Sequence, residues 1–223
     1  MNKLLFSLLL LVTATSCQST PHSTQNTEIM QDKEILKAVQ NNDLQAVKSA
    51  LQNGAKVNTT DQDQRSLLLI ATMNKNIEMA KLLLAYQADV NQQAKNMDSP
   101  FLLAGAMGQT ELLQLFLENG ARFDVFNRYY GSALIPACER GHVATVRLLA
   151  NTPDYPIDHV NRLGWTGLME AVVLGDGSKK YQEIVQILKD AGAKMDIPDH
   201  DGITPLQHAE RRGFREIAKI IRN

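Results

Sequence analysis

Cysteine is scarce in this chain, and so is any excess of charge of one sign. Only two cysteines, Cys17 and Cys138, occur among 223 residues. Two cysteines cannot build the disulfide framework of small secreted proteins, and no zinc-ligand cluster surrounds them. The formal net charge is −1, whereas proteins that bind nucleic acid through its phosphates present a basic face. We therefore expect no disulfide framework, no zinc site and no nucleic-acid partner.

A catalytic constellation is also lacking. None of the five histidines stands in a recognisable block with a serine or cysteine nucleophile, so a catalytic triad has no support. The acidic run from Asp196 to Gly202 lacks the spacing and the final glutamate of an EF-hand calcium loop. Glu170 has no second carboxylate at a spacing known for acid–base catalysis, and we expect Cys138 to be a small buried residue. The sequence thus predicts no enzyme activity, no cofactor and no metal ion.

The apolar run at the N-terminus is short. It extends from Leu4 to Val12, interrupted only by Ser7, whereas a transmembrane helix needs about 20 apolar residues. Lys3 precedes the run, and the small residues 13–16 follow it. This is the layout of a secretory signal peptide. We predict a signal peptide over residues 1–16.

The end of this segment, Ala14-Thr15-Ser16-Cys17, resembles the lipobox of bacterial lipoproteins, with Ala14 where that family favours leucine. The resemblance implies cleavage before Cys17 and lipidation of its thiol. Cleavage by an ordinary signal peptidase, which would leave Cys17 as a free thiol, stays open. Glutamine rather than aspartate follows the cysteine, at Gln18, and this resembles the pattern that sorts lipoproteins of enteric bacteria to the outer membrane. We expect a protein exported to the periplasm that contacts the outer membrane only through its N-terminal lipid.

Residues 17–31 contain many serine, threonine, glutamine and asparagine residues and few apolar ones. Such a segment buries too little surface to offset its ordering entropy, so we predict a flexible tether. The repeated part of the chain is expected to begin at residue 32.

A short block recurs along the rest of the chain: a small polar residue, four mainly apolar residues, and an alanine. Its alanines are Ala71, Ala104, Ala137, Ala171 and Ala209, so the successive spacings are 33, 33, 34 and 38 residues. A second apolar run follows each of them, and glycines such as Gly54, Gly120 and Gly192 then mark helix ends. The period predicts a repeated unit of turn, helix, short loop and helix.

This pattern resembles the ankyrin repeat, with Gly-x-Thr-Pro-Leu intact only at residues 202–206. The resemblance implies an all-α solenoid of about six helix-turn-helix repeats with short hairpin-like tips, over residues 32–223. We expect the repeats at 32–60, 61–93, 94–126, 127–160, 161–198 and 199–223. Two insertions interrupt the period, one residue within 152–156 and five after Gly175, which we expect to lengthen the loop between the fifth repeat's helices.

The resemblance further implies that a partner, usually another protein, binds the tips and the ends of the first helices. At those positions stand Asp63, Arg65, Asp98, Met107, Arg128, Tyr129, Tyr130, Glu139, Arg140, Arg162, Trp165 and Leu174. Tyrosine, tryptophan and arginine dominate binding hot spots. Tyr129, Tyr130 and Trp165, which are three of only twelve aromatic residues, therefore mark the fourth and fifth tips. The alternative, that individual rings only pack on neighbouring tips, stays open.

These observations favour a monomeric, non-catalytic protein that binds a periplasmic or envelope protein. One version is an immunity protein or inhibitor of an envelope-acting toxin. Another is an accessory or scaffolding factor for a periplasmic enzyme or assembly. The least favoured hypothesis, an enzyme or small-ligand binder using residues 175–181 as an active loop, requires a polar pocket beside that loop.

Overall fold

The computed structural model describes residues 21–223. The predicted signal peptide, the lipidation site Cys17 and the sorting residue Gln18 lie outside the described residues. Within 21–223 the structure contains twelve helices and no β-strand, apart from one isolated antiparallel bridge between Thr60 and Ser66. The predicted all-α class is therefore confirmed.

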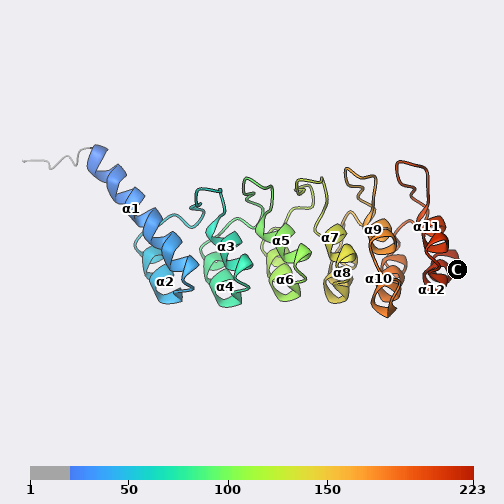
Figure 1. Ribbon diagram of the computed structural model, residues 1–223. Coiled ribbons are helices and arrows are strands. Elements are labelled where there is room, and N and C mark those ends of the chain that lie inside the picture. The colour runs from blue at the N-terminus through green and yellow to red at the C-terminus, as the bar shows by residue number, and fades with distance from the viewer. Residues whose placement is uncertain (1–20) are drawn as a thin grey trace, which may run out of the picture.

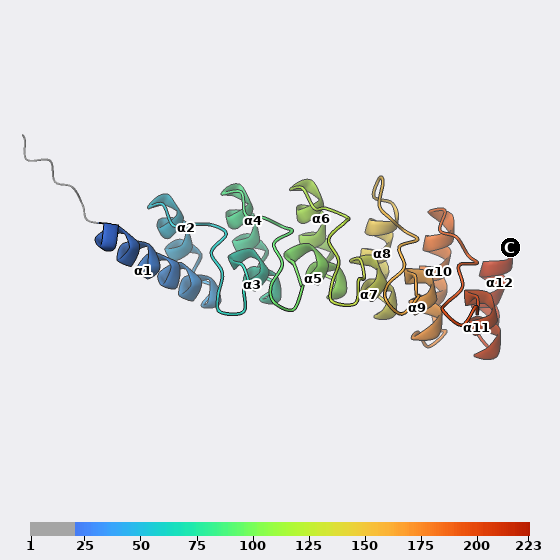
Figure 2. The same ribbon diagram turned by 90° about the horizontal axis from the view of Figure 1, so that it is seen from above.

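The helices come in six consecutive pairs. Their bounds are α1 Pro21–Gln40 with α2 Leu44–Gln52, α3 Leu67–Met73 with α4 Ile77–Ala85, α5 Pro100–Ala106 with α6 Thr110–Glu118, α7 Leu134–Glu139 with α8 Val143–Ala150, α9 Gly167–Val173 with α10 Lys179–Asp190, and α11 Pro205–Arg211 with α12 Arg215–Arg222. Figure 1 shows the pairs side by side in chain order, with the connecting loops projecting from one edge. Viewed from above, the odd-numbered helices form one row and the even-numbered helices the other (Figure 2). This is the predicted solenoid.

The alanines that define the period lie at the most crowded points of the stack. Ala71, Ala104, Ala137, Ala171 and Ala209 are each 0% exposed. Each stands on the first helix of its pair, and those helices pack against one another, α3 on α5, α5 on α7 and α7 on α9. A larger side chain would force neighbouring helices apart. Packing therefore requires a small residue at this position of each first helix, and its recurrence produces the period seen in the sequence.

Helix α1 begins earlier than expected. It runs from Pro21 to Gln40, so residues 21–31 are helical where we predicted part of a flexible tether. Pro21 suits a first helical position, and residues 22–31 contain neither glycine nor a further proline. Once α1 packs through Ile35 and Val39, which are both buried, extending it backwards adds one hydrogen bond per residue without a new nucleation step.

The five-residue insertion is shared between a loop and a helix. α10 has 12 residues and α4 has 9, and Lys179 follows Ala171 by eight residues where Ile77 follows Ala71 by six. Two inserted residues thus lengthen the loop and three extend α10, which corrects the prediction of a purely longer loop. Tyr181 explains the difference, because its ring is buried and its hydroxyl donates to Glu139 O at 2.8 Å.

The fourth repeat departs from its neighbours where its extra residue lies. Tyr155 occupies the position that other repeats give to alanine; its hydroxyl accepts a hydrogen bond from Leu134 N at 3.1 Å. Its ring packs on Phe123 with a centroid separation of 4.9 Å. The amide is a first-turn donor of α7 that has no partner within the helix. Tyr155 therefore satisfies α7 from the following loop.

No helix within residues 21–223 is long and apolar enough to cross a membrane.

Candidate partner-binding groove

The tips are the five loops at residues 61–66, 94–99, 127–132, 161–166 and 199–204, and all five share one backbone pattern. The first residue donates its N–H to the fifth residue's carbonyl, and the fourth donates to the first residue's carbonyl. The fourth residue has a positive φ in every tip, at Gln64, Met97, Tyr130, Gly164 and Gly202. This is a turn closed by a left-handed residue, as in short hairpin loops. Equivalent side chains of successive tips therefore project from equivalent positions.

An aspartate or asparagine holds four of these tips. Asp61, Asn127, Asn161 and Asp199 each stand at the first position, and Oδ1 of each accepts backbone N–H groups from the third and fifth residues. Short polar side chains favour turns for this reason. Asp199, in the acidic run that lacks the EF-hand spacing, thus has its hydrogen bonds within its own tip.

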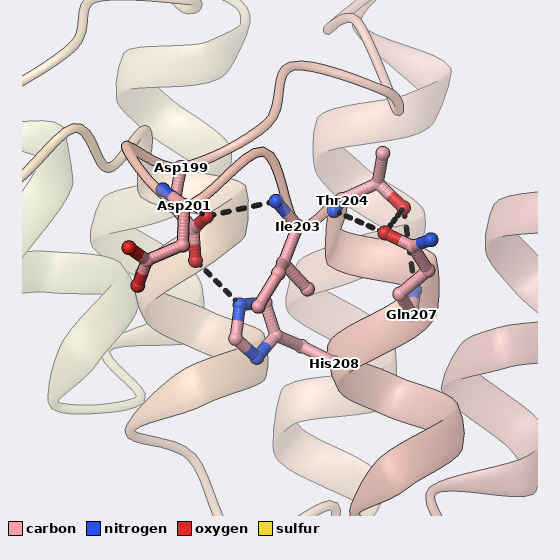
Figure 3. A network of polar contacts seen from close by, with 6 residues as sticks. All are labelled: Asp199, Asp201, Ile203, Thr204, Gln207 and His208. Carbon is pink, nitrogen blue, oxygen red and sulfur yellow. Dashed lines mark hydrogen bonds and ion pairs between the residues drawn. The ribbon is translucent and has the colours of Figure 1, made fainter.

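The last tip is tied to the helix that follows it (Figure 3). His208 Nε2 on α11 donates to Asp199 Oδ2 at 2.7 Å, and this hydrogen bond is the largest cause that lowers the pKa of Asp199. Thr204 and Gln207 form a reciprocal capping box at the start of α11. Hydrogen bonds therefore join the tip to the first helix of the repeat.

The fifth repeat makes the same connection with donor and acceptor exchanged. Asn161 Nδ2 donates to Glu170 Oε1 at 2.8 Å, nine residues apart, as are Asp199 and His208. Both Asn161 and Glu170 are buried, at 5% and 6% exposure. Burial, followed by the nearby charge of Glu139, raises the pKa of Glu170 to about 7, although the bond from Asn161 opposes this. The fifth repeat therefore places a carboxylate where the last repeat has an imidazole.

A groove with a volume of ≈ 460 Å³ crosses the first-helix face over the third, fourth and fifth repeats. Leu103, Pro136 and Glu170 line it at equivalent positions, each one residue before the buried alanine of its helix. Tyr129 and Leu163, the third residues of adjacent tips, line it from the tip side. A larger hollow of ≈ 660 Å³ lies between α6 and α8, and no tip or first-helix residue lines it.

The structure brings seven of the twelve predicted site residues to this groove. They are Asp98, Met107, Arg128, Tyr129, Glu139, Arg140 and Leu174. Asn161, Leu163 and Glu170 also line the groove, and none of them is among the predicted site residues. The alignment of the repeats could have predicted Leu163, because Leu163 stands two residues after Asn161 just as Tyr129 stands two residues after Asn127.

The remaining predicted residues lie elsewhere. Tyr130 lines a different hollow, with its ring 4.4 Å from Phe126 and 5.2 Å from His159 between centroids. Arg162 donates to Arg128 O at 3.0 Å across adjacent tips, and Trp165 is half-buried outside the groove lining. Asp63 and Arg65 belong to the first tip, where Arg65 pairs with Asp61 at 2.7 Å.

The arginines at the groove rim have contacts of their own. Arg140 donates to Ala106 O in the preceding repeat at 2.5 Å, and the guanidinium carbon of Arg128 lies 4.9 Å from the centroid of the Tyr129 ring. Within residues 21–223 no ion pair joins either arginine to Glu139 or Glu170. The charge of Arg140 nevertheless acts on Glu170 and lowers the pKa of that carboxyl group, against the larger effect of burial.

The other groups that could take part in chemistry are packed into the scaffold. Cys138 is 0% exposed, as predicted, and burial raises the pKa of its thiol well above the ordinary value. The inserted loop is held by Arg212, which donates to Gly175 O at 2.8 Å. Within 21–223 no group of three or more histidine, cysteine or acidic side chains is placed to hold a metal ion. The geometry is that of a binding surface on a stack of helix pairs.

A stack of helix pairs with projecting tips and a groove along its first helices defines a repeat solenoid of the protein-binding kind. The family model described as ankyrin repeats (3 copies) matches residues 35–127 and 108–199. The chain therefore belongs to the ankyrin repeat family, whose members are generally non-catalytic scaffolds for protein–protein interaction.

Relatives and solved structures agree with this membership. The ankyrin repeat protein YahD of Escherichia coli (strain K12) is 35% identical over 188 residues, covering 84% of this chain and 94% of its own length. An ankyrin repeat domain from Acinetobacter baumannii AYE superposes with a TM-score of 0.81 at 45% identity, covering 84% of this chain and 95% of that one. The ankyrin repeat protein EF0377 gives a TM-score of 0.83 at 40% identity, covering 85% and 96%.

Proposed function

We propose that this protein is an exported, lipid-anchored binding protein that captures another envelope protein in the groove over its third to fifth repeats. In this proposal it acts as an immunity protein, occluding a toxin or lytic enzyme that acts on the envelope. The groove supplies the binding surface, and lipidated Cys17 would hold the protein at the membrane.

The exposed apolar side chains of the groove carry the proposal. Met107, Tyr129, Leu163 and Leu174 are 45%, 52%, 51% and 48% exposed, and all four line the same groove. Soluble proteins rarely expose several large apolar side chains side by side, so a cluster of this kind marks an interaction site. Aromatic, methionine and arginine side chains are also the types enriched at interfaces.

Capture from envelope extract tests the groove. We expect the wild-type protein to retain a specific partner and the double variant Tyr129→Ala/Leu174→Ala to lose it with an unchanged melting temperature. Tyr130→Ala/Met97→Ala is the matched control, because both side chains are exposed but line a neighbouring hollow. Equal capture by the groove variant and the wild type would contradict the proposal.

The role of the captured protein separates immunity from an accessory function. An immunity protein should abolish the activity of a toxic or lytic partner at equimolar ratio, whereas an accessory factor should leave its partner's activity intact or raise it. The mass of the N-terminal peptide from host cells checks the anchor: an acylated Cys17 is expected, and Cys17→Ser should move the protein to the soluble fraction.

A further inference from the structure

The groove combines an apolar rim with an acidic floor. Glu170 is 6% exposed and lines the groove; Asn161 binds one of its carboxylate oxygens, Oε1. In the described part of the chain no hydrogen bond reaches the other oxygen, Oε2. Oε2 is not among the buried polar atoms without a partner in the described residues, so solvent in the groove reaches it. A donor that enters the groove can therefore replace water at this oxygen.

A second carboxylate lines the same groove. Glu139, at the end of α7, is half-buried and within residues 21–223 its side chain makes no ion pair. Its charge is the second largest cause of the raised pKa of Glu170, which shows that the two carboxyl groups interact. Two neighbouring carboxylates disfavour joint ionisation, and the charge of Arg140 offsets this only in part, because the pKa of Glu170 stays raised. A further cation placed in the groove would relieve the remaining repulsion.

We propose that the groove receives an arginine side chain of the partner protein, whose guanidinium binds Glu170 Oε2 and Glu139 while its aliphatic stem lies against Leu163 and Leu174. This inference rests on the proposed function of the groove. Arginine has five N–H donors in a planar fork and so can serve two carboxylates at once. Its long apolar stem suits an exposed apolar rim above a charged floor.

The last repeat explains why the fifth is suited to this role. His208 occupies the position equivalent to Glu170 and bonds to Asp199, so that repeat achieves the same tip-to-helix connection with a donor rather than a carboxylate. The connection therefore does not require a carboxylate at this position. What Glu170 adds, and His208 does not, is an acceptor that lines the groove.

Short peptides test the chemistry directly. A capped peptide with one arginine between two leucines should bind the purified protein at least about 10-fold more tightly than the same peptide with neutral citrulline. Calorimetry gives the affinities, and the fluorescence of Trp165, in the fifth tip, gives a second readout. Glu170→Gln should remove most of the difference and Glu139→Gln part of it, whereas Glu118→Gln on α6 should change nothing. A lysine peptide that binds best, equal binding of the arginine and citrulline peptides, or no binding of either overturns the proposal.

The pH dependence supplies an independent check. Binding of the arginine peptide should strengthen as the pH rises through about 7, where Glu170 loses its proton, and binding of the citrulline peptide should not. The charged and titratable groups that face Glu170 are Glu139, Arg140 and Cys138 on α7 and its C-terminal end. Glu170→Gln must abolish the pH effect; an effect that persists in this variant belongs to another group and contradicts the assignment.

The captured partner separates the two proposals. If Glu170→Gln still captures the partner while Tyr129→Ala/Leu174→Ala does not, the groove binds a protein but not through an arginine on Glu170. If both variants capture it equally, the proposed function of the groove fails as well. Loss in both, with citrulline discrimination in the peptide assay, supports both.

Discussion

At the scale of single residues, Tyr155 supplies a hydrogen bond to the start of α7 that the N-cap residue Ala133 cannot make. Its hydroxyl accepts the Leu134 N–H, so Tyr155→Phe leaves a buried donor without a partner. We expect a loss of about 1–3 kcal/mol in the free energy of unfolding, measured by urea denaturation. Tyr86→Phe is the control, because no hydrogen bond to the Tyr86 hydroxyl is found in the described chain, and it should stay within about 0.5 kcal/mol. Equal effects of the two changes would contradict the capping role.

Glu170 makes stability depend on pH in a distinctive direction. Its pKa rises from 4.5 to about 7 in the fold, so the folded state binds more protons than the unfolded state between these values. Its contribution to the free energy of unfolding therefore falls as the pH rises through that window, by up to about 3 kcal/mol. Asp199 acts oppositely: its pKa is lowered in the fold, so its contribution is lost on acidification below its ordinary range.

Comparing the wild type with Glu170→Gln isolates the contribution of Glu170 to the pH dependence of stability. Urea unfolding at about pH 5 and about pH 8 should show that Glu170→Gln gains stability relative to the wild type as the pH rises. The glutamine can still accept the hydrogen bond from Asn161, so the tip should remain attached. Parallel stability profiles for the two proteins would refute the raised pKa.

At the scale of elements, the close approach of α5 and α7 depends on Gly105. A Cβ at this position would lie 2.7 Å from Ala133 Cβ and 2.8 Å from Ala133 O. Gly105→Ala gains about 0.5–1 kcal/mol of helix propensity, but overpacking costs about 1–3 kcal/mol, so we expect net destabilisation. Adding Ala133→Gly should recover only part of the loss, because the carbonyl remains. A rise in melting temperature for Gly105→Ala would show that the two helices separate easily.

The elements also show where prediction from sequence stops. The paired helices follow from the spacing of the buried alanines and from caps such as Ser66 and Thr204. The length of α10 does not follow, because only the packed structure shows that Tyr181 reaches Glu139 O. The start of α1 at Pro21 was likewise hidden by a polar composition that suits a tether and an exposed helix equally well.

At the scale of the whole molecule, each repeat is stabilised by its neighbours. α11 and α12 cover α9 and α10, and Lys189 donates to Ile220 O at 2.6 Å. Removing residues 199–223 should therefore lower the free energy of unfolding by roughly 3 kcal/mol or more and expose apolar surface, which dye binding and urea unfolding would detect. Arg215→Ala, a surface change in the same repeat, should have little effect. An unchanged melting temperature after truncation would refute nearest-neighbour stabilisation at this end.

The sequence by itself determined the architecture. A repeat needs the same small residue wherever its helices touch, so Ala71, Ala104 and Ala137 reveal the stack from their spacing alone. Only the tertiary structure decided which exposed residues act together. Neighbouring residues of one tip diverge, so Tyr129 enters the groove and Tyr130 packs on Phe126. Glu170 joins Tyr129 from a different repeat because stacking, rather than chain proximity, brings first helices and tips to one face.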